Sequence, residues 1–423
     1  MKKIILSLMA LTSLTASAQF GAPRQNPIVP SVTTDVVEDF KPASSNQDNK
    51  QYPMVNSQRM VRAQISAPKA TFVGLDIAGK IYEMTKDENG VWTGTSEPQD
   101  EGFHYYQLNI DGASVPDPGS LYYYGASRWG SGIEIPSADQ DFWQVKNVPQ
   151  GSMSEVFYWS TYTEKMRRCH VYLPAEYFTN PTKKFPVLYL QHGMGENEYG
   201  WAEQGHTAQI MDNLIAEGKA VPCIIVMDNG LNTRRPGEQS GFGGFGGQRP
   251  QGAAGPGNFN GPRPAGGQRP QGAPGQGGPR RGGFGGFSEG FKNVLFNDII
   301  PMVEKNYRVI ADPQHRAYAG LSMGGMQARE ITLANPEKFA YVGSFSSGAW
   351  SVDQVKASEG FAKNVKLLFM SGGGKENMGC EEAAKNIHEQ LGMKAVGYES
   401  PGTAHEWHTW RRSLYQFAQL LFK

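Results

Sequence analysis

The stretch that most restricts the fold of this chain is a serine held between two glycines. Gly320-Leu-Ser322-Met-Gly324 stands between a short apolar run at 316–319 and a helical pattern that begins at Met323. A sharp turn from strand to helix needs small residues on both sides, because a side chain at either glycine would collide with the neighbouring strand or helix. A chance Gly/Ser-rich turn is the alternative in a chain with 52 glycines. The flanking patterns favour the sharp turn, which places Ser322 at a helix N-terminus, where free N–H groups favour negative charge.

Strand and helix patterns alternate over most of the chain after residue 151. This order is typical of a mostly parallel sheet with helices on both faces. Two earlier apolar runs, 155–160 and 168–173, are expected to form an antiparallel edge of the same sheet. The other strands are expected at 188–191, 224–227, 317–320, 341–344, 367–370 and 395–398, and the helices at 207–217, 291–306, 323–335, 380–391 and 407–422.

The C-terminal part of the chain supplies the partners that a reactive Ser322 would need. A serine hydroxyl is a weak nucleophile unless a neutral imidazole takes its proton and a carboxylate orients that imidazole. In the order serine, acid, histidine, the acid falls on Glu376, after an apolar strand and three glycines. The histidine falls on His405, in the loop before the last helix. His408 is the rival, but helix packing or capping explains a histidine at that position.

A glycine-rich turn after the strand at 188–191 supplies a further component. The turn reads His192-Gly-Met194-Gly, and its glycines allow backbone N–H groups to point toward a substrate carbonyl. The expected donors are the N–H groups of Met194 and Met323, the latter next to the serine. The His192 ring is expected to support the loop. Because both turns follow parallel strands, they should meet at one edge of the sheet.

From about residue 151 to 423 the sequence resembles the esterase D and feruloyl-esterase type of α/β-hydrolase, carbohydrate esterase family one. The matching pieces are Tyr172-Leu-Pro174, His192-Gly-Met-Gly195, 319–325 and 405–410. The resemblance implies a serine carboxylester hydrolase with Ser322 as nucleophile and His405 as base. It requires no metal and no organic cofactor.

The acid position departs from the family pattern. The family usually has an aspartate after this strand, where this chain has Glu376. A glutamate can orient the histidine in the same way if its loop lies further back by one methylene. Asp353, Glu381 and Glu382 are the alternatives.

The resemblance also implies a substrate class. The expected substrate is a plant cell-wall polysaccharide such as arabinoxylan, esterified with ferulate or another hydroxycinnamate, and acetylated xylan is a neighbouring possibility. Two other hypotheses stay open. One is a siderophore esterase of the enterobactin type, which also joins an N-terminal β-domain to this fold. The other is a non-catalytic glycan-binding protein, against which the intact serine, histidine and glycine turns argue.

Three aromatic residues are candidates for the substrate pocket. Tyr199 and Trp201 follow the glycine-rich turn, and a structural role is an equal alternative for both. Trp350 lies beyond the strand at 341–344, in a loop that should approach the same edge of the sheet.

The region from 57 to 148 has a different character, with short alternating runs separated by frequent turns. This pattern predicts an antiparallel β-sandwich. Trp92, Phe103-His-Tyr-Tyr106, Asp111-Gly112 and Asp117-Pro118 resemble the Ig-like modules at the N-termini of glycogen-branching enzymes, some of which bind α-glucans. An aromatic group at 122–124 with Trp129 could stack on sugar, but packing against the hydrolase domain is the favoured interpretation.

The N-terminus has the features of a bacterial secretory signal peptide. Lys2-Lys3 precedes an apolar run at 4–14, and Ala16-Ser-Ala18 forms a cleavage site before Gln19. Export to the periplasm or beyond is therefore expected, without a membrane span. Residues 19–56 read as a flexible leader. The formal net charge of +0 gives no electrostatic indication of a nucleic-acid partner.

The segment 234–287 interrupts the hydrolase pattern. It is dominated by Gly, Pro, Gln and Arg, and it repeats one seven-residue sequence at 247–253 and 267–273. Such a composition cannot bury a core, so disorder is expected. Its place after a strand end suggests a position beside the active site, either as a lid or, as we favour, as neutral filler.

Overall fold

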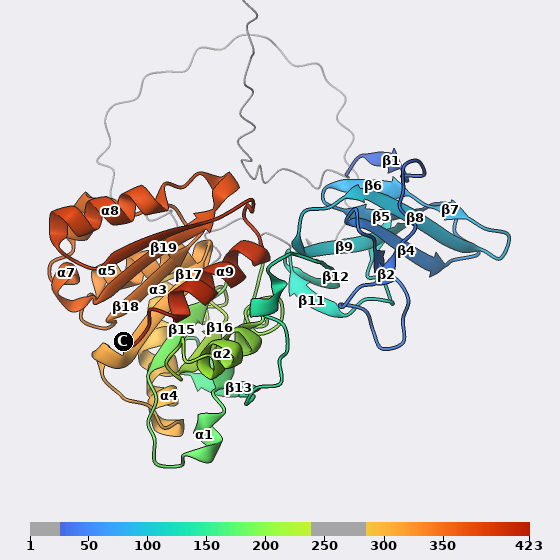
Figure 1. The fold of residues 1–423 in the computed structure, drawn as a ribbon. Helices are drawn as coiled ribbons and strands as arrows, with labels where there is room; N and C mark the ends of the chain where they lie inside the picture. Colours follow the sequence, from blue (N-terminus) through green and yellow to red (C-terminus); the bar gives the residue numbers. More distant parts are fainter. Residues whose placement is uncertain (1–25, 238–284) are drawn as a thin grey trace, which may run out of the picture.

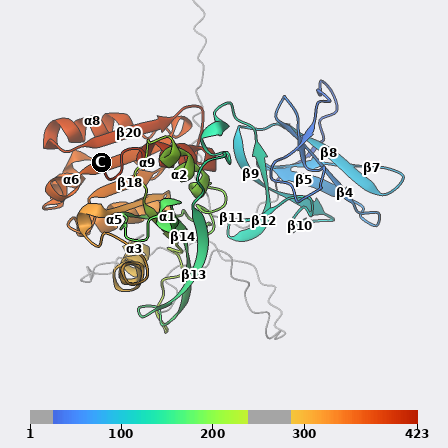
Figure 2. The same cartoon turned by 60° about the horizontal axis from the view of Figure 1, so that its bottom comes forward.

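The computed structural model describes residues 26–237 and 285–423. These residues form a β-rich N-terminal region and a larger region built on one eight-stranded sheet (Figure 1). Turning the molecule shows the two regions side by side, joined along one flank (Figure 2). The expected signal peptide at 1–18 and residues 238–284 of the expected insertion lie outside the described residues.

The large sheet has the order β13-β14-β16-β15-β17-β18-β19-β20. The six strands from β16 to the β20 edge of this order run parallel to one another. Strand β14 is antiparallel to both β13 and β16. The alternating patterns therefore predicted the parallel sheet and its antiparallel edge. The strands are β13 (Ser152–Ser160), β14 (Lys165–Leu173), β15 (Val187–Gln191), β16 (Ile224–Asp228), β17 (Arg316–Leu321), β18 (Tyr341–Phe345), β19 (Leu367–Gly373) and β20 (Ala395–Ser400).

Helices cover both faces of this sheet and enclose two apolar cores. Along β15, Tyr189 points into the core beneath helices α3, α4, α5, α6 and α8, whereas Leu188 and Leu190 point into the core beneath α2 and α9. This alternation follows from the two-residue period of a strand. The helices are α1 (Glu176–Thr179), α2 (Thr207–Ala216), α3 (Gly285–Val294), α4 (Ile300–Asn306), α5 (Met323–Ala334), α6 (Val352–Ala357), α7 (Phe361–Asn364), α8 (Cys380–Leu391) and α9 (Trp407–Ala418).

The helix expected at 291–306 differs from its prediction. The described part of α3 (Gly285–Val294) includes residues 285–287 of the segment expected to be disordered, and a π-helical stretch (Leu295–Ile299) joins α3 to α4.

The N-terminal region consists of two sheets that enclose one core. One has the order β1-β6-β5-β9-β12-β11, with β10 beside β9, and the other has the order β2-β3-β4-β8-β7. Val61 of the second sheet and Leu75 of the first belong to this core and are fully buried. The strands are β1 (Ile28–Pro30), β2 (Lys41–Pro42), β3 (Met54–Val55), β4 (Met60–Ser66), β5 (Val73–Ile77), β6 (Lys80–Glu83), β7 (Thr85–Lys86), β8 (Val91–Pro98), β9 (Gly102–Ile110), β10 (Ala113–Val115), β11 (Tyr122–Gly125) and β12 (Arg128–Ile135).

The expectation of a flexible leader at 19–56 is wrong for residues 26–56. Strand β1 pairs in parallel with β6, and Ala43 and Val55 are buried in the N-terminal core. Polar side chains form hydrogen bonds with backbone groups in this irregular segment. For example, the side-chain amide of Asn46 donates to the carbonyl oxygens of Lys50 and Pro53. The strands here are too short to give a periodic signal, which is why the composition suggested a tether.

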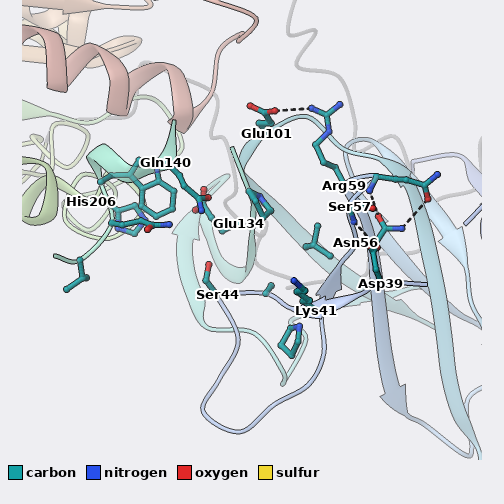
Figure 3. A pocket seen from close by; sticks show the side chains of 18 of the residues that line it. Asp39, Lys41, Ser44, Asn56, Ser57, Arg59, Glu101, Glu134, Gln140 and His206 are labelled. Carbon is teal, nitrogen blue, oxygen red and sulfur yellow. Dashed lines mark hydrogen bonds and ion pairs between the residues drawn. The ribbon is translucent and has the colours of Figure 1, made fainter. Parts of the chain in front are cut away.

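The N-terminal region contacts the large region through ion pairs, and a cavity lies between the two regions. Arg411 of α9 forms a bidentate pair with Glu134 of β12 at 2.7 and 2.9 Å, and both side chains are buried. Beside this pair lies a cavity of about 950 Å³, with His206 and Gln140 on one side and Arg59 on the other (Figure 3). Ser322 is not among the residues that line it.

No helix within the described ranges is long and apolar enough to cross a membrane.

Candidate active site

The backbone at Ser322 has the sharp turn that the two glycines predicted. Ser322 joins β17 to α5 with φ of 50° and ψ of −115°, a conformation that L-residues adopt only under strain. A Cβ on Gly320 would lie 2.4 Å from the carbonyl carbon of Gly324, and a Cβ on Gly324 would lie 2.5 Å from the carbonyl oxygen of His192. Both positions therefore exclude any larger residue.

Three side chains from separate loops form a hydrogen-bonded line at this turn. His405 Nε2 lies 3.0 Å from Ser322 Oγ, and His405 Nδ1 lies 2.7 Å from Oε1 of Glu376. Because an ionised carboxylate only accepts hydrogen bonds, Nδ1 carries the ring proton, and Nε2 is left to accept from the serine hydroxyl. The arrangement can therefore withdraw a proton from Ser322.

The second carboxylate oxygen of Glu376 is held by two other donors. Oε2 accepts from the N–H of Gly373 at 2.7 Å and from the hydroxyl of Ser346 at 2.7 Å. Burial of the side chain works to raise the pKa of Glu376, but the hydrogen bonds from His405, Gly373 and Ser346 outweigh it and lower the pKa below its usual value. Trp410 of α9 donates to the Ser346 hydroxyl and fixes that donor in turn.

The glycine-rich turn after β15 lies directly against the serine. A Cβ added to Gly193 would come within 3.2 Å of the Ser322 Cβ, so only glycine allows this approach. The ring of His192 is buried, and its Nε2 accepts from the N–H of Gly230 at 3.0 Å. The other nitrogen, Nδ1, lies 2.7 Å from the carbonyl oxygen of Gly193 and must be its donor. Burial lowers the pKa of His192 to about 4, so the ring is neutral and supports the loop.

A family model described as "Putative esterase" matches residues 160–252 and 264–420. The chain belongs to this esterase family.

Curated relatives and solved structures agree with the family and the fold. The esterase is 41% identical over 395 residues to an endo-1,4-beta-xylanase/feruloyl esterase of Xylanibacter ruminicola, an alignment that covers 91% of this chain and 48% of the relative. It is 28% identical over 121 residues to the uncharacterized protein YbbA of Bacillus subtilis, covering 26% of this chain and 48% of that protein. The chain thus spans about half the length of the curated relatives it matches.

Among solved structures, the enterobactin esterase of Shigella flexneri in the presence of enterobactin matches with a TM-score of 0.56 at 16% identity. The match covers 86% of this chain and 92% of that chain. At this identity the likeness concerns the fold, and it establishes the esterase-type α/β-hydrolase architecture.

The aromatic residues expected to line a substrate pocket have different surroundings in this esterase. Trp201 and Trp350 are each only 1% exposed and belong to the two cores on opposite faces of the large sheet, so the expectation that they reach a pocket is corrected. Their indole N–H groups are satisfied internally, by the carbonyl oxygen of Gln191 and the hydroxyl of Ser344 respectively. A position near the strand ends could not tell an inward-facing tryptophan from an outward-facing one.

Tyr199 is partly exposed and connects the two regions of the esterase. Its ring packs edge-on against Trp129 of β12, with the centroids 5.2 Å apart, and its hydroxyl donates to Glu155 at 2.5 Å. Trp129 remains half exposed, so it both packs against the hydrolase region and presents one face to solvent.

The rival residues lie elsewhere. His408 is buried in α9, 3.3 Å from an Asp139 oxygen, and burial lowers its pKa to about 4. Asp353, Glu381 and Glu382 are exposed on α6 and α8. None of the hydrogen bonds found within the described ranges joins these four residues to Ser322 or His405.

Three residues around the site were missed by sequence reasoning. Ser346 follows β18 at the same sheet edge, and the strand-end rule could have found it. Glu196 and Tyr105 meet across the two regions at 2.9 Å, and they lie 91 positions apart. Nothing in the local sequence links them.

Proposed function

We propose that this esterase is an exported serine carboxylester hydrolase that releases ferulate or related hydroxycinnamates from plant cell-wall polysaccharide. The observation that carries the proposal is the hydrogen-bonded line Ser322–His405–Glu376 at a strained strand-to-helix turn. This geometry is the one that nucleophilic acyl transfer needs.

The reaction runs in two halves through an acyl-enzyme. His405, oriented by Glu376, takes the proton of the Ser322 hydroxyl as Oγ attacks the ester carbonyl carbon. The backbone N–H groups of Met194 and Met323 are proposed to stabilise the oxyanion of the tetrahedral intermediate. His405 then gives the proton to the departing alcohol. In the second half, water attacks the acyl-enzyme by the same route and regenerates Ser322.

The substrate class rests on the relative from Xylanibacter ruminicola, whose name includes feruloyl esterase. The 41% identity extends over 91% of this chain. The esterified polysaccharide is the proposed partner. Export follows from the sequence of residues 1–18, with cleavage after Ala18. We also propose that the β-rich N-terminal region is an Ig-like module of the type found in glycogen-branching enzymes, since two sheets enclose its single core.

Hydrolysis of methyl ferulate, methyl caffeate and 4-nitrophenyl acetate by the purified protein, beside Ser322→Ala, tests the proposal. Release of hydroxycinnamate that disappears in the variant supports it. Turnover of the acetate alone would keep the serine mechanism and replace the substrate by an acetylated one such as acetylated xylan. Turnover of ferric enterobactin without turnover of feruloylated arabinoxylan would assign a siderophore esterase. Absence of any serine-dependent turnover would leave a non-catalytic glycan-binding protein.

A further inference from the structure

The N-terminal region holds the loop after β15 at two consecutive residues. The N–H of Ser127, in the tight turn between β11 and β12, donates to the carbonyl oxygen of Gly195 at 2.8 Å. The hydroxyl of Tyr105, on β9, lies 2.9 and 3.0 Å from the two carboxyl oxygens of Glu196. Both contacts fall within three residues of Gly193, where an added Cβ would lie 3.2 Å from the Ser322 Cβ.

The Tyr105 hydroxyl joins two loops of the active site. It donates to Glu196, and it accepts from Nε2 of Gln204 at 2.6 Å and from Nε1 of Trp407 at 3.2 Å. A phenolic oxygen donates one hydrogen bond and accepts two, so its capacity is filled. Trp407 begins α9, two residues after His405. One buried hydroxyl therefore ties the loop beside Ser322 to the segment that carries the histidine.

Glu196 depends on this hydroxyl because it has no cation to bind. No Lys, Arg or His within the described part of the chain forms an ion pair with Glu196, whereas Glu198 pairs with Arg168 at 2.6 Å. The Glu196 side chain is 7% exposed. A buried carboxyl group without a partner costs free energy, so the hydroxyl of Tyr105, together with the indole N–H of Trp407, stabilises the loop in this position.

We propose that Tyr105 is a positioning residue of the esterase reaction, which fixes the turn Gly193–Glu196 (the oxyanion loop) against Ser322 through Glu196. The proposal rests on the proposed function of Ser322. Tyr105 does not touch the reacting atoms. It acts through the turn Gly193–Glu196, in which the N–H of Glu196 donates to the carbonyl oxygen of Gly193 at 3.3 Å. The N-terminal region is in this way a part of the active site.

The matched pair Tyr105→Phe and Tyr106→Phe tests the proposal in the full chain. Tyr106 is the next residue of β9, is a buried tyrosine, and donates to Asp117 at 2.8 Å within the N-terminal region. Both variants lose one hydroxyl, but only Tyr105→Phe loses a contact with the oxyanion loop. Steady-state kinetics on methyl ferulate and on 4-nitrophenyl acetate, and affinity for an aryl boronic acid that mimics the tetrahedral intermediate, supply the readouts.

We expect kcat of Tyr105→Phe to fall about 10- to 100-fold, because small misplacements at an active site cost rates of this order. KM should change less than threefold, the boronic acid should bind more weakly by a similar factor, and Tyr106→Phe should keep the kcat of the unchanged protein. Equal kcat values for the two variants would overturn the proposal. If Ser322→Ala retained activity, the proposed function itself would fail, independently of Tyr105.

A second pair covers the case in which Tyr105→Phe does not fold. Glu196→Gln keeps an acceptor for Tyr105, whereas Glu196→Leu removes it at similar size. We expect Gln to retain kcat within about threefold and Leu to lose at least 10-fold, on the same order as other positioning effects. Equal kcat for Gln and Leu would overturn the proposal.

Discussion

Glu376 approaches His405 through one carboxylate oxygen and uses the other to anchor itself. Oε1 lies 2.7 Å from His405 Nδ1, while Oε2 accepts from Gly373 and Ser346. The 3-10 turn (Gly374–Glu376) directly after β19 places the glutamate close to its own strand end. The extra methylene relative to aspartate is therefore used to reach out from that turn to the histidine.

Two substitutions of Glu376 distinguish the effect of its charge from the effect of its side-chain length. In Glu376→Gln the amide group can donate to Nδ1, which leaves the proton on Nε2 and prevents that atom from accepting the Ser322 proton. We expect kcat to fall about 10³- to 10⁴-fold, as for the wrong tautomer in other triads. Glu376→Asp keeps the charge but shortens the reach, and its loss of kcat should be smaller. Hydrolysis of methyl ferulate measures both, and a Gln variant more active than the Asp variant would contradict this assignment.

Gly193 can be tested by adding a single methyl group. In Gly193→Ala the new Cβ would meet Leu321 Cδ1 at 2.5 Å and the Ser322 Cβ at 3.2 Å, so the loop must move away from the nucleophile. We expect kcat to fall about 100-fold or more, since loss of one oxyanion donor costs 10²- to 10³-fold. The melting temperature, measured alongside, shows whether the fold survives. A folded variant with unchanged kcat would exclude a role for this loop in oxyanion binding.

The three residues of the hydrogen-bonded line could be picked out from the sequence because each belongs to a local pattern. Ser322 lies between two glycines, and His405 and Glu376 follow in the order that the fold family imposes. The parallel sheet was likewise predicted by repeated short apolar runs. The flexible leader expected at 19–56 is wrong for residues 26–56, where β1 is held by pairing with β6, some 50 residues away, and such pairing leaves no local periodicity.

The contacts between the two regions were beyond the reach of sequence reasoning. Tyr105 and Glu196 each look ordinary in their own segment, and only the tertiary arrangement buries them together. The prediction that Trp201 and Trp350 line a substrate pocket was wrong for a related reason. A tryptophan near a strand end can face the solvent or the core, and the facing is decided by packing against Phe345 and Phe361 respectively.

We expect two adjacent arginines of α9 to contribute very different amounts to the stability of the protein. The Arg411 side chain is fully buried against Glu134, whereas Arg412 pairs with Asp139, which is 45% exposed. Arg411→Met leaves a buried carboxylate unpaired, and we expect the free energy of unfolding to fall by about 3–5 kcal/mol. Arg412→Met should cost less than Arg411→Met, because the Asp139 carboxylate that it leaves behind is in contact with solvent. Urea denaturation measures both, and the double variant Arg411→Met/Glu134→Leu should recover much of the loss, because it removes the unpaired charge.

Ionisation of Glu196 should make the stability of the protein depend on pH. Burial raises the pKa of Glu196 to about 8 from an ordinary value of 4.5, although hydrogen bonds from Tyr105 and Trp407 act to lower it. Between these two values the folded state binds more protons than the unfolded state. The free energy of unfolding must therefore fall as pH rises from about 4.5 to about 8, by at most about 1.4 kcal/mol per pH unit.

Two titratable groups that interact electrostatically with Glu196, Tyr105 of β9 and Tyr124 of β11, do not ionise in this window, because burial raises the pKa of each above its usual value. Glu196→Gln is the matched control, since it cannot ionise and keeps an acceptor for the Tyr105 hydroxyl. Urea denaturation from pH 5 to 9 measures the free energy of unfolding of both proteins. As pH rises, the unchanged protein should lose stability relative to the Gln variant, and the difference between the two should become constant above about pH 8. A difference that does not change with pH would show that Glu196 is already ionised in the folded protein at pH 5, and that the interface between the two regions accommodates its charge.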